Sequence, residues 1–193
     1  MLDHVFTDAI GSTRDALEQA LLERQAFEEH FQTDVLLGDV TFDTSYSLPG
    51  EGLPARIQAD IRLEWPTWSQ ASYRSWYLDE EFKEPPRIDI RVTMRVQQLL
   101  AAPDPADIIA VLPDRSSPVG SEELVRSGPT VETRYPNDLQ DPLHAVEVSY
   151  VGSYEVAESA LVDGSALDEH FSSMGGWIAS ALVRLGDLRL EHH

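Results

Sequence analysis

Strict alternation of apolar and polar residues restricts the fold of this chain more than any other feature of its sequence. The clearest example runs from Ile57 to Trp65, where apolar side chains occupy every second position. Successive side chains of a strand point to opposite faces, so this pattern predicts a strand with one apolar and one polar face. The same pattern recurs in the segments 36–46, 88–96 and 146–156. Together these segments predict an antiparallel sheet that is apolar on one side only.

Charged residues occupy the predicted polar face. Arginines and glutamates there can pair across strands, and each such pair contributes about 0.2–1 kcal/mol. The arginines are Arg62, Arg91 and Arg95, and the glutamates are Glu64, Glu147 and Glu155. The same arginines can instead build a subunit interface, and the sequence leaves both uses open.

The C-terminal stretch supplies a cover for the apolar face. A cap at 163–165 predicts a short helix that carries Leu167 and Phe171, and a second helix follows the glycine pair 175–176. A sheet with one apolar face needs a second layer that buries it. We therefore predict an α+β fold, a four-stranded antiparallel sheet with the C-terminal helices packed on one face.

An extra N-terminal helix is predicted ahead of the strands. Apolar residues at 17, 21, 27 and 31 recur at helical spacing, which indicates an amphipathic helix from Thr13 to Phe31. Its apolar stripe can lie on the sheet of this domain or on a neighbouring subunit, and the sequence does not choose between them.

The chain is accordingly divided into three parts. Residues 1–32 form an N-terminal helical extension, and residues 33–189 form one α+β domain. Residues 190–193 are typical of an expression-tag remnant, so their two histidines are left out of any metal site.

Net charge restricts the partners of the chain. Its 34 acidic and 14 basic residues give a formal net charge of -20, which repels phosphate backbones and anionic lipid surfaces. We therefore expect no nucleic-acid partner. A basic or unfolded polypeptide fits this field better.

Several absences in the sequence point to the cytoplasm. No apolar run approaches the length of a membrane span, so we expect no membrane insertion. The first residues lack the basic and apolar regions of a secretory signal. With zero cysteines the chain forms no disulfide and no thiolate metal site. These features favour a soluble cytoplasmic protein.

Motifs of catalysis are missing from the sequence. It contains no phosphate-binding loop, no nucleophile elbow, no helical pair of histidines and no calcium loop. The carboxylates at 79–81 are interpreted as a solvated loop edge. We expect a binding protein rather than an enzyme, with no cofactor and no metal.

An aromatic cluster falls in the segment 66–86, which is predicted as a loop. Large amphipathic rings suit a recognition surface, because they bury much area at a small entropic cost. The candidate recognition residues are Trp68, Tyr73, Trp76 and Tyr77. The alternative is that these rings pack over an edge of the sheet. A second long loop is predicted at 101–143. For its stretch from Pro113 to Leu143 the sequence leaves three uses open, which are to cover a groove, to contact a second subunit or to extend freely.

Taken together, the strands and the terminal helices resemble the SecB family of export chaperones. The resemblance is carried by the strand at 90–96, the strand at 146–156 and the ending at 171–186, and it spans about residues 34–189. The extra N-terminal helix and the two long loops depart from the family. The chain also stops before the tail with which the family docks on the export ATPase, so that contact is the least supported of those implied.

The resemblance implies a polypeptide-holding function without chemistry. SecB proteins keep nascent or toxin-like clients unfolded in long apolar grooves between sheet and helices, and they assemble as dimers of dimers. By this resemblance we expect unfolded polypeptide clients and a homo-oligomer, either dimer or tetramer. The expected groove residues are Val92, Met94, Tyr150, Tyr154, Phe171, Trp177 and Ile178. For these residues an ordinary closed core is an equal alternative, and a small-molecule-binding domain with an enclosed apolar pocket is the alternative function.

Overall fold

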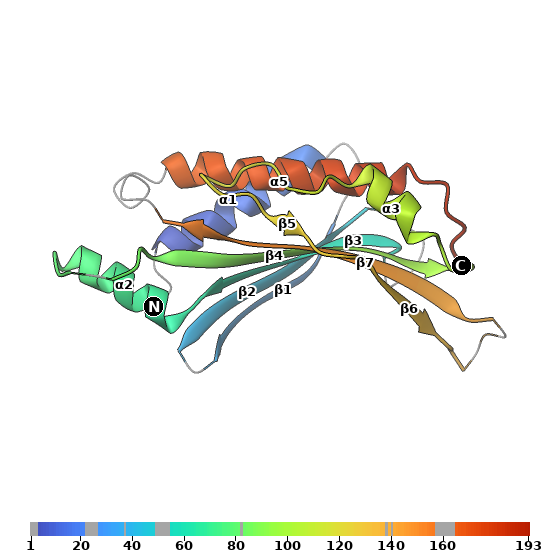
Figure 1. Ribbon diagram of the computed structural model, residues 1–193, viewed down its shortest axis with the longest axis horizontal. Helices are drawn as coiled ribbons and strands as arrows, with labels where there is room; N and C mark the ends of the chain where they lie inside the picture. Colours follow the sequence, from blue (N-terminus) through green and yellow to red (C-terminus); the bar gives the residue numbers. More distant parts are fainter. Residues whose placement is uncertain are drawn as a thin grey trace.

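The structure is a computed structural model that describes residues 4–21, 27–36, 38–48, 55–81, 83–137, 139, 141–156 and 165–193. These residues form an antiparallel sheet with a layer of helices on one side of it, and a further helix, α2, lies at one end of the sheet (Figure 1). The helices are α1 (His4–Leu21), α2 (Thr67–Tyr77), α3 (Pro105–Val111) and α5 (Ser165–Gly186). The strands are β1 (Phe27–Leu36), β2 (Asp39–Ser47), β3 (Ile57–Trp65), β4 (Arg87–Leu99), β5 (Val125–Arg126), β6 (Thr130–Arg134) and β7 (Leu143–Glu155).

The α+β class is confirmed, but the sheet is wider than predicted. Within the described residues it has seven strands in the order β1-β2-β3-β4-β7-β5, and β6 pairs with β7 beside that path. The four predicted strands correspond to β2, β3, β4 and β7, which are consecutive neighbours. The predicted number of four was wrong because β1, β5 and β6 show no strict alternation that marks them in the sequence.

The N-terminal helix is shifted from its predicted position. It begins at His4 and ends at Leu21, whereas Phe27 and Phe31 belong to β1. A spacing of four residues suits one side of a helix and also one side of a strand, so local sequence does not decide between them. The antiparallel pairing of β1 with β2, from Phe27 opposite Ser47 to Leu36 opposite Asp39, decides for the strand.

The C-terminal region is one continuous helix rather than the two predicted. α5 passes through the glycine pair without a break. A Cβ atom on Gly175 would lie 2.8 Å from Cβ of Ala16 and 3.1 Å from the carbonyl oxygen of Thr13. Gly175 therefore allows α1 to pack closely against α5, and does not end a helix. The predicted cap at 163–164 lies outside the described residues.

Both segments predicted as long loops contain secondary structure. The segment 66–86 holds α2, and the segment 101–143 holds α3, β5 and β6. The start of α3 follows from its sequence, because the Asp104 side chain accepts a hydrogen bond from the Ala106 amide (2.9 Å) and Pro105 follows the cap. This Asp-Pro signal was overlooked.

The two faces of the sheet differ, as the alternation predicts. One face, here called the covered face, packs against α1 and α5 and includes Phe42, Ile61, Val92 and Tyr150, all buried. The opposite face, here called the open face, has no described helix over its centre (Figure 1). Arg62, Asp89, Arg91 and Val151 are exposed on the open face.

Candidate functional site

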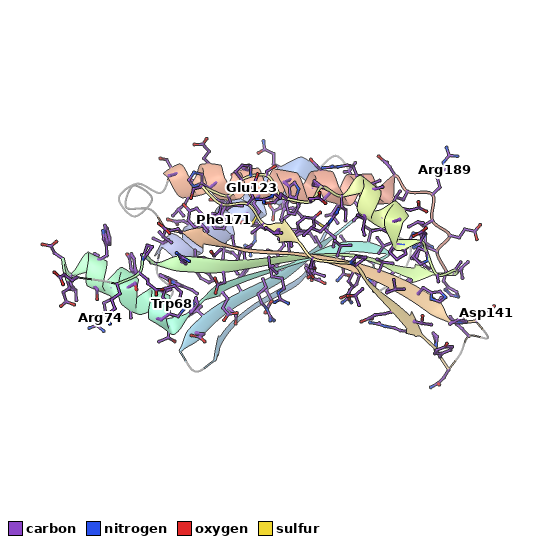
Figure 2. All side chains as sticks on the ribbon, in the orientation of Figure 1. Trp68, Arg74, Glu123, Asp141, Phe171 and Arg189 are labelled. Carbon is purple, nitrogen blue, oxygen red and sulfur yellow. The ribbon has the colours of Figure 1, made fainter. Side chains whose placement is uncertain are left out.

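The seven predicted groove residues lie together, but in a closed core. All of them are at most 6% exposed, and they come from β4, β7 and α5 on the covered face. The rings of Tyr150 and Trp177 meet edge to face with centroids 4.8 Å apart, and those of Tyr154 and Phe171 meet at 5.1 Å. Figure 2 shows Phe171 between α5 and the sheet. In this structure these residues therefore form an ordinary closed core, which was the alternative to a groove.

The segment that follows α3 closes this core from the side. The Tyr150 hydroxyl donates a hydrogen bond to the carbonyl oxygen of Pro113 (2.7 Å). Gly120 has a φ of +68°, and a Cβ atom there would lie 2.8 Å from the Tyr154 ring. Burial raises the pKa of both tyrosine hydroxyls. Three uses were left open for the second long loop. The part of this loop around Pro113 and Gly120 covers the apolar core.

His170 takes part in this closure. Its Nδ1 atom lies 3.0 Å from the Tyr154 hydroxyl, and the two rings pack edge to face at 5.6 Å. The phenol and the imidazole satisfy one another, so this pair is explained by packing.

The predicted recognition residues lie on helix α2 and divide into two groups. Tyr73 is buried against Trp65 of β3, and Trp76 stacks on Tyr73 with ring centroids 5.9 Å apart. Trp68 and Tyr77 are 43% and 72% exposed. The prediction of a loop for this segment was wrong. The spacing of the aromatic residues also fits a helix that packs one of its sides against the rest of the protein. Two of the four rings thus pack within the fold and two face solvent.

Helix α2 is anchored at its first turn by a carboxylate from β2. Asp39 accepts hydrogen bonds from the backbone amide of Thr67 (2.6 Å) and from its hydroxyl (2.7 Å). These hydrogen bonds lower the pKa of Asp39. Gln70 donates to the carbonyl oxygens of Gly38 and Trp65, both at 2.8 Å. The exposed ring of Trp68 is therefore held at the end of the sheet, as Figure 2 shows.

The open face contains a hollow of about 350 Å³. It is lined by Arg62, Glu64, Asp89, Ile90, Arg91, Val151 and Gly152. Strands β3, β4 and β7 contribute these residues, and β3 leads directly into α2. The hollow thus lies in the middle of the sheet, and the exposed aromatic helix begins at the end of one of its strands.

The charges around the hollow are only partly paired. Arg62 donates two hydrogen bonds to Asp43, from Nε at 2.6 Å and from Nη2 at 3.0 Å. Among the described residues, no ion pair or side-chain hydrogen bond joins Glu64, Asp89 or Arg91 to another side chain. Burial raises the pKa of Asp89, and the positive charge of Arg87 acts in the opposite direction.

The predicted cross-strand pairs are present only in part. Arg95 pairs with Glu147 as expected, whereas Glu155 pairs with Arg87. Arg62 pairs with Asp43 and not with Glu64. Sequence reasoning placed these arginines on the correct face but did not find the hollow. Five of the residues that line it have the parity of the polar face, but the sequence does not show which residues of neighbouring strands lie side by side, because that depends on the register.

Within the described ranges, no group of three or more His, Asp or Glu side chains is arranged to hold a metal ion. No helix among the described residues is long and apolar enough to cross a membrane.

Comparison with known proteins adds no relative. No protein-family model matches the chain, and searches of curated proteins and of solved structures return no significant similarity.

Proposed function

We propose that this chain is a polypeptide-binding protein of the chaperone type, which holds unfolded or nascent segments on the open face of its sheet. The covered face is filled by the protein's own side chains. We therefore place the binding surface on the open face, and not at the seven core residues that the resemblance to SecB predicts.

The open hollow is the observation that carries this proposal. Side chains of both charge signs line it, and Arg91, Glu64 and Asp89 are not used by the fold for mutual ion pairs. Next to them Val151 is 41% exposed, and Val125 lies directly opposite it on β5 and is 48% exposed. A solvated sheet face needs neither the hollow nor this apolar pair. An extended polypeptide can contact both the charged side chains of the hollow and the two exposed valines.

Charge and aromatic exposure support the same function. A net charge of -20 attracts segments with positive charge and keeps a complex in solution. Trp68 and Tyr77 of α2 and Leu78 at its C-cap present apolar surface, and they are 43%, 72% and 51% exposed. Exposed aromatic rings of this kind are frequent at protein-binding surfaces.

A small-molecule ligand is the alternative function. The hollow has a volume within the range of ligand sites, which begins at about 300 Å³. Such sites are mostly apolar and enclose the ligand, whereas four charged side chains line this hollow. The lining therefore favours the polypeptide.

Suppression of client aggregation tests the proposal. The purified chain is mixed in stoichiometric amounts with several chemically denatured proteins, and light scattering is followed after dilution. We expect the wild type to suppress aggregation and Val151→Asp to lose much of that effect, because a carboxylate replaces an apolar contact in the hollow.

Val131→Asp is the matched control for this experiment. Val131 is 43% exposed, close to the 41% of Val151, but it lies on β6 opposite Val146 and so on the other side of the sheet. It should suppress aggregation like the wild type. If the wild type fails with every client, or if both variants lose activity equally, the open face is not the binding surface. Light scattering of the free protein reports the expected oligomer in the same samples.

A further inference from the structure

The register of β3 and β4 places like charges side by side in the hollow. Arg62 lies directly opposite Arg91, and Glu64 lies directly opposite Asp89. Like charges at directly opposed positions destabilise a sheet. Elsewhere on the open face opposite charges are paired across strands, as in Arg95 with Glu147 and Arg87 with Glu155. The hollow therefore departs from the pattern of the face that surrounds it.

A different register between β3 and β4 would remove the repulsion between these like charges. A shift of two residues keeps every side chain on its own face. In one direction it would bring Arg62 opposite Asp89, and in the other it would bring Glu64 opposite Arg91, both attractive pairs. The observed register is shared with the apolar pairs on the covered face, such as Leu63 with Ile90 and Ala59 with Met94. In this register Glu64, Asp89 and Arg91 form no ion pair among the described residues.

These charges form two levels along the strands. Glu64 and Asp89 make an acidic level, and Arg91 makes a basic level two residues away, about 6.8 Å along an antiparallel strand. Only one charge of the basic level is available, because Asp43 already binds Arg62 through two hydrogen bonds. An extended segment repeats its side chains on one side at the same interval.

We propose that the hollow recognises an extended polypeptide segment that carries a basic side chain and, two residues further along in either chain direction, an acidic side chain. This inference rests on the proposed function and specifies its client. The basic group lies between Glu64 and Asp89, and the carboxylate pairs with Arg91. Charge-assisted hydrogen bonds of this type are stronger than neutral ones and give specificity for the segment.

Fluorescence anisotropy with labelled synthetic peptides tests the inference. Two peptides have the same composition, with one lysine and one glutamate among serine, threonine and valine. In the first the charged residues are two positions apart, and in the second they stand at opposite ends. The two peptides have the same net charge, so a difference in affinity reports the spacing of the charges. We expect the closely spaced peptide to bind on the order of tenfold more tightly.

Two variants of equal net charge sharpen this test. Arg91→Glu should abolish the preference for the closely spaced peptide, because its carboxylate then meets a like charge. Arg189→Glu changes the net charge by the same amount at an exposed position on the helix side of the molecule (Figure 2) and should keep the preference. Asp89→Asn, which keeps the shape of the side chain, should weaken binding of the closely spaced peptide. Circular dichroism checks that all variants are folded.

The outcomes separate the inference from the function on which it rests. Equal binding of both peptides by the wild type overturns the spacing rule but leaves polypeptide binding in place. A preference that survives Arg91→Glu also overturns it. Failure of both peptides to bind, together with failure to suppress aggregation, overturns the proposed function as well.

Discussion

Tyr150 and Val151 are neighbours on β7, yet they belong to two different environments. Tyr150 is fully buried on the covered face, where its ring meets Trp177 and its hydroxyl binds the Pro113 carbonyl. Val151 is 41% exposed on the open face, directly opposite Arg91, which forms no ion pair among the described residues. Side chains of the covered face pack closely against one another, whereas Glu64, Asp89 and Arg91 of the open face have no ion-pair partner among the described residues. We therefore expect stability to depend mainly on the covered face, and we propose the open face for recognition.

The largest effect expected from this comparison is on stability. Tyr150→Ala should lower the free energy of unfolding by about 3–5 kcal/mol, because it leaves a large cavity and an unpaired carbonyl. Val151→Ala should change it by only about 0.5 kcal/mol, since it removes little buried surface. Urea denaturation of both variants gives the two values. Similar losses for the neighbouring positions would mean that the two faces are not distinct environments.

A smaller effect is expected where two helices of the covering layer meet. Gly175→Ala should destabilise the protein by about 1–3 kcal/mol, because its Cβ would lie 2.8 Å from that of Ala16. Gly176→Ala should instead stabilise it by about 0.5–1 kcal/mol, since nothing lies within 4 Å of the added Cβ and alanine favours the helix. Thermal unfolding distinguishes the two. Opposite signs for these glycines would confirm the close packing of α1 on α5, whereas equal signs would contradict it.

The smallest effect compares two arginines of the open face. Arg95→Ala should cost about 0.2–1 kcal/mol, because Arg95 pairs directly with Glu147 across β4 and β7. Arg91→Ala should cost less or even stabilise, because Arg91 lies opposite Arg62 and removing it relieves repulsion. Denaturation at low and high salt measures both changes. A larger loss for Arg91 than for Arg95 would assign Arg91 to the fold rather than to a ligand.

Part of the fold was predictable because some signals are local. The alternation in β3 and β4 correctly predicted which residues are buried, such as Ile61 and Val92. It could not predict β1, whose two phenylalanines suit a helix as well as a strand, nor the short β5 and β6. The glycine pair at 175–176 signals a helix end in sequence, but in the structure Gly175 permits contact with another helix.

The candidate site was likewise predictable from the sequence only in part. Parity alone assigned Arg62 and Arg91 to the polar face, and this assignment is confirmed. The seven core residues were correctly expected to lie together between sheet and helix, but their exposure could not be predicted. Whether an apolar surface is open depends on segments remote in sequence, such as the one around Pro113 and Gly120 that covers Tyr150 and Tyr154.

By itself the sequence determined which side of the sheet each side chain faces, because the period of two is a property of every extended backbone. Tertiary structure decided which side chains became neighbours. Pairing between strands is non-local, and a shift of two residues preserves the faces while exchanging the partners. In this protein that choice brought Arg62 beside Arg91 and Glu64 beside Asp89, and so created the charged hollow.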